Sequence, residues 1–297
     1  MNMRLLSKSL GATAAAMVLA LAGAVQAEDL PIIGQPLDKG IGFQPASTIV
    51  AEHTFALEHM ILIIISVIVV FVTGLLIWVI VRYNQRANPK PASFTHNSPL
   101  EIAWTLVPIL ILVFIGAYSL PVLFKQEEIP VAEVSIKATG NQWYWSYEYP
   151  KEGLSFDAMM VGAGENRLTP EVEEQLKAMG LGKEQFLLAT DNAVVVPVGK
   201  IVVVTVTGAD VIHSWKVPAF GVMQDAVPGR LAQTWFKVDK EGIYFGQCSE
   251  LCGKDHAYMP IMVKAVSPEA YDQWVTEMGG TVADAGAAPS TVQVASN

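Results

Sequence analysis

Two long stretches without a charged residue constrain this chain more than any other feature. Residues 60–81 form a stretch of 22 residues, and residues 102–124 form a second stretch of 23. About 20 helical residues cross the hydrocarbon core of a bilayer, so both stretches predict membrane-spanning helices. The composition agrees, because 52% hydrophobic and only 16% charged residues are too apolar a mixture for an ordinary soluble domain.

The charges that flank these stretches predict the orientation of the resulting hairpin. The connecting segment, residues 82–101, carries three basic residues and one acid, whereas residues 28–58 carry five acids and one lysine. Cytoplasmic loops are enriched in Lys and Arg, so we expect the connecting segment in the cytoplasm. The N-terminal segment and everything after residue 124 are then expected on the opposite side of the membrane.

The first 27 residues have the layout of a cleaved secretory signal. Arg4 and Lys8 precede an apolar run over residues 10–25, and an acidic pair follows Ala27. A first membrane helix is the alternative, but the run is short and rich in Ala and Gly. We therefore expect a mature chain that begins at residue 28, outside the cytoplasm, which agrees with the orientation of the hairpin.

The segment after the second apolar stretch has the pattern of a β-rich domain. Short runs rich in β-branched and aromatic residues alternate with Pro and Gly turns, which is typical of an antiparallel sandwich or barrel. The expected strands are residues 134–138, 142–149, 187–190, 201–207, 231–238, 242–247 and 261–266.

Two helices are expected within this domain. Thr169 can cap the first, Pro170 suits its first position and Gly180 ends it, while the second is expected over residues 268–278. The tail after that has too little apolar surface to bury and is expected to be flexible. The expected organisation is a signal peptide (1–27), an external segment (28–56), a transmembrane hairpin (57–124), a periplasmic domain (125–278) and a flexible tail (279–297).

The negative charge of the chain is concentrated in its outer part. From residue 125 to the C-terminus, 13 basic residues stand against 22 acidic ones, which accounts for the whole formal charge of −9. A nucleic-acid-binding protein needs a basic surface, so the composition argues against that class. A basic protein is the more natural partner.

The thiol chemistry of the chain is confined to one loop. The two cysteines, Cys248 and Cys252, lie within twelve residues together with His256 and Met259. One Cys, two His and a weak axial Met make a mononuclear copper site, and a second thiolate on the same loop could let both sulfurs bridge two metal ions. The second imidazole is expected from His213, which follows a strong predicted strand.

Two other arrangements fit the same residues. A disulfide between Cys248 and Cys252 is permitted outside the cytoplasm, but it leaves the spacing of His256 and Met259 unexplained. A tetrahedral zinc site could use both cysteines with His213 and His256, although it has no use for Met259.

Several further motifs accompany this loop, and together they resemble subunit II of the haem-copper cytochrome c oxidases. The motifs are Thr95–Asn97, Glu101 with Trp104–Pro108, the aromatic run Gln142–Tyr149, Asp225–Arg230 and the loop Gln247–Met259. The resemblance extends over residues 43–274, and the insert at 167–185 and the tail depart from the shortest family members. It implies an α+β membrane protein in which a two-helix hairpin precedes a cupredoxin-like antiparallel β-sandwich.

The resemblance also implies a binuclear copper centre, CuA, in the outer domain. Cys248 and Cys252 would bridge the two coppers, and His213 and His256 would each complete one. Met259 and the main-chain carbonyl of Glu250 would be weak outer ligands. The side chain of Glu250 would reach a magnesium ion shared with subunit I; a solvated loop acid is the alternative.

Further residues acquire implied roles from the same resemblance. Trp143 would be the point where electrons enter from cytochrome c, although aromatic residues in such a run usually pack a strand. Glu101 would stand at the entrance of a proton pathway, or would simply be a first-turn acid favoured by the helix dipole. Asp225 and Arg230 would lie near subunit I and its haem propionates, or form an internal ion pair.

Four acids would dock the lysine-rich face of cytochrome c. These are Glu148, Asp157, Asp191 and Asp210. Taken singly, each is more often a solvated surface charge, but the charge of −9 supports electrostatic steering by the group as a whole.

The expected function is electron transfer within a cytochrome c oxidase of the bacterial inner membrane. The chain would accept electrons from cytochrome c and pass them to haem in subunit I, where oxygen is reduced to water with proton translocation. Its partners would be subunit I, other oxidase subunits, cytochrome c and membrane lipid. A quinol oxidase subunit would lack the copper ligands, nitrous oxide reductase would lack the hairpin, and a copper-delivery protein would need neither Met259 nor Trp143. A purely structural anchor would not need the ligand loop.

Overall fold

The structure is a computed structural model, and it describes residues 30–282. The expected signal peptide and the tail beyond residue 282 lie outside the described residues. All the helices and strands given below belong to one compact unit that begins at Ile32.

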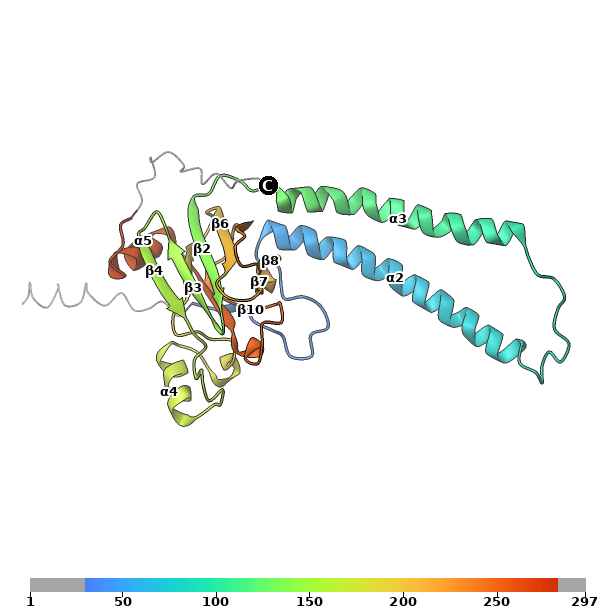
Figure 1. Cartoon of the computed structure of the whole chain (residues 1–297), viewed down its shortest axis with the longest axis horizontal. Coiled ribbons are helices and arrows are strands. Elements are labelled where there is room, and N and C mark those ends of the chain that lie inside the picture. The colour runs from blue at the N-terminus through green and yellow to red at the C-terminus, as the bar shows by residue number, and fades with distance from the viewer. Residues whose placement is uncertain (1–29, 283–297) are drawn as a thin grey trace, which may run out of the picture. The chain divides into compact units, whose positions relative to one another are not determined.

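Two long helices precede the β-rich part of the chain (Figure 1). α2 spans Ile49–Arg82 and α3 spans Ser98–Glu127. The side chains of Thr48 and Asn97 cap them by accepting hydrogen bonds from backbone N–H groups of the first turn. Each helix has an apolar window that is not buried within the chain, so length and composition suit a pair of membrane spans. Both helices are longer than the charge-free stretches, because the backbone hydrogen bonds of each helix extend into the polar residues at its ends.

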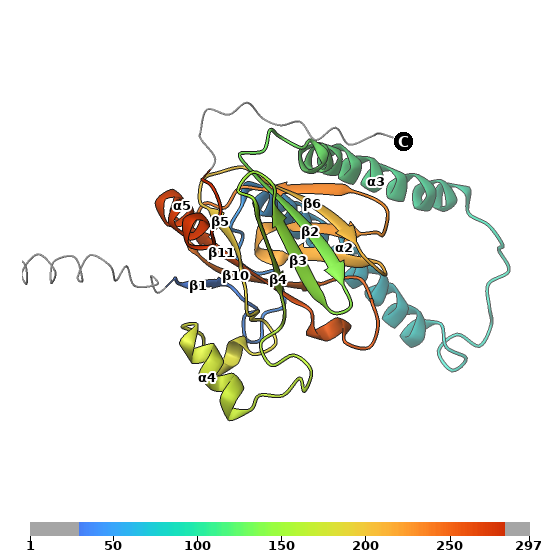
Figure 2. The same cartoon turned by 60° about the vertical axis from the view of Figure 1, so that its left-hand side comes forward.

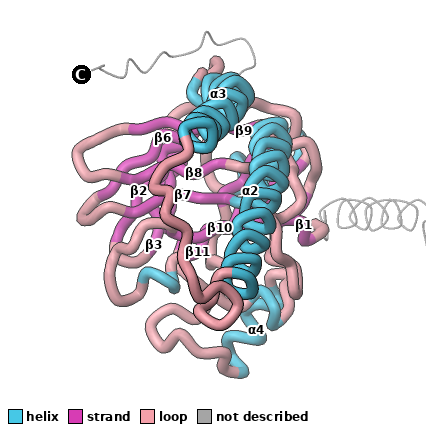
Figure 3. Tube along the Cα trace, turned by 90° about the vertical axis from the view of Figure 1, so that its right-hand side faces the viewer, coloured by secondary structure: helices cyan, strands magenta, loops and turns pink. Residues whose placement is uncertain are grey.

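The two helices lie side by side when viewed along their length (Figure 3), and side-chain contacts join the start of α2 to the end of α3. Gln126 Nε2 donates to Thr54 Oγ1 over 2.6 Å, and Lys125 Nζ lies 3.5 Å from His53 Nε2. Hydrogen bonds between polar side chains stabilise helix pairs in an apolar environment. These contacts therefore fix the hairpin at the end from which the β-domain continues.

A short joint connects the start of α2 to the β-domain. The Thr48 hydroxyl donates to the carbonyl of Phe220 over 2.7 Å, and both Thr48 and Ala51 are buried. Gly221 has a left-handed φ of 67°, and a Cβ at this position would lie 2.6 Å from Ala51 Cα. The helix and the turn therefore pack against each other with no room for a side chain between them.

Replacing Gly221 by alanine should lower the free energy of unfolding by about 1–3 kcal/mol, the usual cost of extra atoms in a packed site. Thermal unfolding of the full chain in detergent measures the change. Gly199→Ala is the control, because Gly199 has a φ of 74° but no atom within 4 Å of an added Cβ. Equal losses in both variants would show that backbone strain alone, rather than the packed joint, causes the effect.

The β-domain is built from two sheets that share one core (Figure 2). The first sheet has the order β5-β11-β10-β7-β8, with β1 beside β10, and the second has the order β4-β3-β2-β6-β9. The strands of the first are β1 (Ile32–Gly34), β5 (Val194–Pro197), β7 (His213–Val217), β8 (Val222–Ala226), β10 (Gly242–Cys248) and β11 (Pro260–Val266). Those of the second are β2 (Val134–Asn141), β3 (Tyr144–Tyr149), β4 (Leu154–Ala158), β6 (Val202–Gly208) and β9 (Ala232–Phe236).

The sheets are mixed, not purely antiparallel as expected. β2 pairs in parallel with β6, β5 with β11, and β1 with β10. In β2 every second residue is buried, and this alternation directs apolar side chains to the core whatever the direction of the neighbouring strand. The predicted two-sheet domain is confirmed, and the direction of these strand pairs is corrected.

Aromatic side chains fill the space between the sheets. Trp145, Tyr147 and Trp215 are almost completely buried, and Trp215 Nε1 donates to the Tyr147 hydroxyl over 3.2 Å. The Trp215 ring also stacks on Phe236 with centroids 6.1 Å apart. Because this core fixes β3 and β7, it also fixes the loops that extend from their ends.

Two of the expected strands differ in the structure. Residues 186–188 form a turn after the 3₁₀ helix η1 (Lys183–Gln185), in which Leu187 has a left-handed φ of 72°, and Thr190 forms only an isolated antiparallel bridge with Met160. The strand of this region is β5 instead. Gln142 and Trp143, expected to begin a strand, form the turn that connects β2 to β3. The short strands β1, β4, β7 and β8 were not expected at all; β4 and β8 each carry polar residues at two of their five positions, which weakens the pattern.

The two helices expected within the outer domain are present. α4 (Pro170–Ala178) begins at the cap Thr169, and α5 (Pro268–Glu277) lies near the end of the described chain. After α5, the backbone N–H groups of Gly280 and Thr281 donate to the carbonyls of Val275 and Glu152, respectively. The first residues of the expected flexible tail are therefore hydrogen-bonded to the domain.

Candidate metal centre

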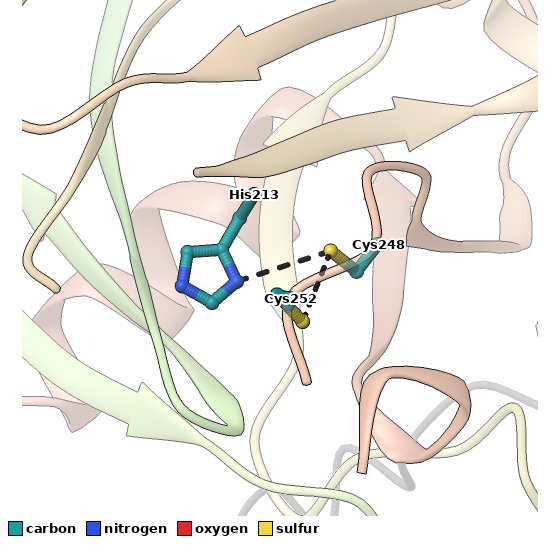
Figure 4. Close-up of side chains that lie close together, drawn as sticks. All are labelled: His213, Cys248 and Cys252. Carbon is teal, nitrogen blue, oxygen red and sulfur yellow. Dashed lines mark hydrogen bonds between the residues drawn. The ribbon is translucent and has the colours of Figure 1, made fainter. Parts of the chain in front are cut away.

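The two cysteines lie side by side at one end of the first sheet. Cys248 is the last residue of β10 and Cys252 lies four residues later in the loop before β11, with their sulfur atoms 3.9 Å apart (Figure 4). Both are free thiols and both are buried, with 6% and 3% of their surfaces exposed. A disulfide has its sulfurs about 2.04 Å apart, so these two sulfurs are separate donors.

Each thiol has an imidazole of its own beside it. His213 begins β7, and its Nδ1 lies 3.9 Å from Cys248 Sγ (Figure 4). His256 begins the 3₁₀ helix η3 (His256–Tyr258), and its Nδ1 lies 3.6 Å from Cys252 Sγ. Within residues 30–282, the donor atoms that all lie within 4.8 Å of one another are those of His213, Cys248 and Cys252, without His256. The four donors thus do not converge on a single point.

The remaining predicted ligands border the same pair of sulfurs. The carbonyl oxygen of Glu250 lies 3.3 Å from Cys248 Sγ, while its side chain is exposed. Met259 is 1% exposed, belongs to the same buried cluster as both cysteines, and accepts a backbone hydrogen bond from Cys248 over 3.1 Å. Thiolate, imidazole, thioether and carbonyl donors together form a set that suits copper.

Asp210 orients the ring of His213. Its Oδ1 lies 2.8 Å from His213 Nε2 and accepts the backbone N–H of Val211 over 2.7 Å. A carboxylate on one ring nitrogen fixes which nitrogen is left to bind a metal, here Nδ1. Asp210 is thus engaged with the site, in addition to being the exposed acid that the sequence indicated.

A glycine makes room for the same ring. A Cβ at Gly140, the seventh residue of β2, would lie between 2.7 and 2.9 Å from three atoms of His213. On another side, the Trp145 ring meets the imidazole edge-on with centroids 6.1 Å apart. His213 is completely buried, so its position is determined by these neighbours.

The surroundings give the two thiols different acidities. Burial raises the pKa of both; at Cys248, hydrogen bonds with His213 and with the backbone of Ser214 and Glu250 outweigh burial and bring the pKa to about 7. At Cys252, burial and the neighbouring Cys248 sulfur raise the pKa to about 12. The pair therefore releases one proton readily, and a bound metal would have to displace the second.

The turn between β2 and β3 touches the cysteine loop. Trp143 is half-buried, and its Nε1 donates to the carbonyl of Cys252 over 3.3 Å. Gln142 Nε2 donates to the same oxygen over 2.8 Å. Lys254 Nζ lies 5.6 Å from the centre of the Trp143 ring. Sequence analysis missed Gln142, because nothing in its immediate surroundings indicated that this turn would meet a loop 110 residues away.

The other acids expected to dock a partner lie on the surface, and local groups engage each of them. Glu148 pairs with Lys137 over 2.7 Å, and Asp157 accepts from the Ser146 hydroxyl over 2.6 Å. Asp191 accepts backbone hydrogen bonds at the turn before β5. All three side chains stay exposed, but none contacts the cysteine loop.

Three further predicted residues lie apart from this site. Glu101 accepts a hydrogen bond from Asn97 N over 3.0 Å in the first turn of α3, a position that suits the alternative of a first-turn acid favoured by the helix dipole. Asp225, on β8, and Arg230 are both exposed, and among the described residues neither forms an ion pair. The internal ion pair considered for these two is therefore not formed.

Comparison with known proteins gives a consistent assignment over nearly the whole chain. Residues 134–266 match the family model for the periplasmic domain of cytochrome c oxidase subunit II, and residues 36–122 match that for its transmembrane domain. Cytochrome c oxidase subunit 2 of Cereibacter sphaeroides is 58% identical over 283 residues, covering 94% of this chain and 93% of its own. The probable subunit 2 of Rickettsia bellii is 41% identical over 90% of this chain and 94% of its own.

A solved structure is similar over the outer domain. The crystal structure of the periplasmic domain of cytochrome oxidase subunit II from Bradyrhizobium japonicum is 47% identical, covering 51% of this chain and 96% of its own, with a TM-score of 0.42. The sequence matches cover both the helical hairpin and the β-domain. The chain therefore belongs to the cytochrome c oxidase subunit II family.

Proposed function

We propose that this chain accepts electrons from cytochrome c at a binuclear copper centre and delivers them to haem in subunit I, where oxygen is reduced to water with proton translocation. Family membership makes the chain a component of a haem-copper oxidase, a membrane-bound oxidoreductase complex with partner subunits. It also places the C-terminal domain in the periplasm. The copper centre and the electron path are the proposed parts.

The observation that carries this proposal is the pairing of each thiol with a different imidazole. Cys248 has His213 beside it and Cys252 has His256, at 3.9 and 3.6 Å, across a sulfur pair 3.9 Å wide. A single tetrahedral ion would draw all four donors to one point. Donors divided in this way suit two ions that share both sulfurs, with the Glu250 carbonyl and Met259 as outer ligands.

The residues of this chain hold, orient and shield such a pair. When bound, two coppers that share the thiolates would supply a one-electron carrier. Asp210 keeps Nδ1 of His213 free to bind, and the buried cysteines exclude water from the sulfurs. Trp143 is half-exposed and hydrogen-bonded to Cys252, so it offers a donor protein an aromatic contact next to the ligands.

Metal stoichiometry and electron paramagnetic resonance test the proposal. The full chain would be purified in detergent, kept reduced so that the two thiols stay free, and loaded with copper. We expect two coppers per chain and one unpaired electron shared by both nuclei. One copper, or a single tightly held zinc, would contradict a binuclear centre and favour the zinc alternative.

The charge of the outer domain predicts that association with cytochrome c depends strongly on salt. Residues from 125 onward carry a net charge of −9, and exposed acids such as Asp157 contribute to it. The Debye length falls from about 30 Å at 0.01 M to about 10 Å at 0.1 M, so steering should weaken. We expect the KM of the assembled oxidase for cytochrome c to rise at least tenfold over this range. A KM that is independent of salt would contradict docking by charge.

Replacing Asp210 by alanine should distinguish its role in orienting His213 from its role in docking cytochrome c. The change removes the acceptor of His213 Nε2, and loss of such an outer partner typically costs about 10–100-fold in metal affinity. Copper retention against a chelator, measured beside Asp157→Ala, checks this. If Asp210→Ala and Asp157→Ala both retain copper and both only raise the KM for cytochrome c, then Asp210 acts solely in docking.

Several finer assignments belong to the same proposal. Glu250, whose carbonyl faces the sulfurs while its side chain is exposed, would bind magnesium together with subunit I. Asp225 and Arg230, both exposed and not paired with each other, would contact subunit I. Glu101 would admit protons at the cytoplasmic side, and the complex would reside in the bacterial inner membrane in contact with lipid.

A further inference from the structure

Gln142 is hydrogen-bonded to the cysteine loop, a contact that a residue used only for docking a partner would not need. Its Nε2 donates to the Cys252 carbonyl over 2.8 Å, which is shorter than the 3.3 Å hydrogen bond from Trp143 Nε1 to the same oxygen. A carbonyl oxygen has two lone pairs, so these two donors complete its hydrogen bonding. The peptide plane of a proposed copper ligand is thus held between two side chains of one turn.

The same residue is attached to the loop that carries His213. The backbone N–H of Gln142 donates to Asp210 Oδ2 over 2.8 Å, while Asp210 Oδ1 lies 2.8 Å from His213 Nε2. One residue therefore connects Cys252, from the loop before β11, with His213, from the start of β7. The Cys248 sulfur also lies between these two ligands, 3.9 Å from His213 Nδ1 and 3.9 Å from Cys252 Sγ, so Gln142 adds a second connection that uses none of the donor atoms.

Gly253 allows the side chains of Gln142 and Trp143 to lie close to the cysteine loop. A Cβ at this position would lie 3.0 Å from Trp143 Cζ2 and 3.2 Å from Gln142 Nε2. Its φ of 128° is also one that L residues rarely adopt. The loop thus leaves space at this point for both donors to reach the Cys252 carbonyl.

We propose that Gln142 is a positioning residue that clamps the Cys252 and His213 sides of the metal centre to each other and holds Trp143 against Cys252. This inference rests on the proposed copper centre and goes beyond it by assigning a residue that binds no metal. The competing role for an exposed glutamine on this surface is docking of the electron donor. The two roles differ in whether the bound metal senses the change.

Gln142→Met tests the clamp, because methionine keeps the length of the side chain but cannot donate a hydrogen bond. The full chain, loaded with copper in detergent, would be examined by electron paramagnetic resonance and by redox titration, and its copper loss to a chelator would be timed. We expect an altered hyperfine pattern, a shifted reduction potential and copper loss faster by about 10–100-fold, the range for outer partners of metal ligands. Gly253→Ala should produce the same changes by pushing both donors away.

Gln273→Met is the matched control, because Gln273 is also exposed and donates to Glu277 over 2.7 Å within α5, away from the loop. It should leave all three readouts unchanged. If Gln142→Met keeps the spectrum, potential and copper retention of the unaltered chain and changes only the KM for cytochrome c, Gln142 serves docking and the clamp is overturned. An unaltered chain that binds no copper pair would instead overturn the proposed function together with this inference.

Discussion

Replacing Cys252 by serine should abolish the copper pair and, with it, electron transfer from cytochrome c. A serine hydroxyl is a hard, protonated oxygen, whereas the proposed centre depends on two soft thiolates 3.9 Å apart. Loss of a residue that only hydrogen-bonds to a metal ligand lowers metal affinity by about 10–100-fold. Loss of a ligand shared by both coppers should therefore lower copper affinity by more than about 100-fold. Metal analysis and oxygen consumption with reduced cytochrome c would measure the two losses in parallel.

Ser249→Ala is the control for this substitution. Ser249 is next to Cys248, and the contact that it makes to Ser214 uses the backbone N–H, so removing its hydroxyl should leave the centre intact. Two coppers retained in Cys252→Ser would contradict the assignment of both sulfurs as shared ligands. A spectrum that changes while one copper remains would show that Cys248 and His213 can hold an ion by themselves.

Replacing Gly140 by alanine should weaken copper binding from a residue that never touches the metal. The added methyl group would lie 2.7–2.9 Å from His213, a distance that forces some atom to move. The ring is completely buried between Trp145 and Asp210, so relief must come from displacement of the imidazole itself. We expect copper affinity to fall by about 10–100-fold, while the free energy of unfolding falls by only about 1–3 kcal/mol.

Copper content after dialysis, together with the spectrum of the remaining centre, would check this expectation. Gly42→Ala is a suitable control, because a Cβ at Gly42 meets no atom within 4 Å and the φ of Gly42 is not in the left-handed region. If Gly140→Ala keeps the unaltered spectrum and affinity, then β2 can shift away without moving His213, and the ring is held less firmly than its contacts indicate.

The features of the fold and site that the sequence predicts are those that depend on residues close together in the chain. The charge-free stretches determine the two long helices by length alone, and five of the six proposed metal ligands lie in the segment from Cys248 to Met259. His213 could be selected because few other histidines lie outside the spans. Each of these inferences needs only the local pattern and the chemistry of the residue type.

The rest depends on contacts between distant segments. Gly140 lies against His213 at the start of β7 and Gln142 meets the loop after β10, and no local pattern encodes these contacts. Asp210 lies only three residues before His213, but that spacing does not by itself specify the hydrogen bond to Nε2. The parallel pairing of β2 with β6 was missed for a related reason, since a period of two specifies the buried face and not the neighbour's direction. Residues 187–190 had strand-like composition but turn sharply at Leu187.

The joint between α2 and the β-domain has a consequence for the proposed transfer of electrons to subunit I. A domain on a flexible linker would take up many distances from the subunit that accepts its electrons. Its effective concentration near that subunit would fall as the linker became longer. The start of α2 is in direct buried contact with the turn at Gly221, through Thr48 and Ala51. At this joint no flexible linker separates α2 from the β-domain, so the dilution that a linker would cause does not arise there.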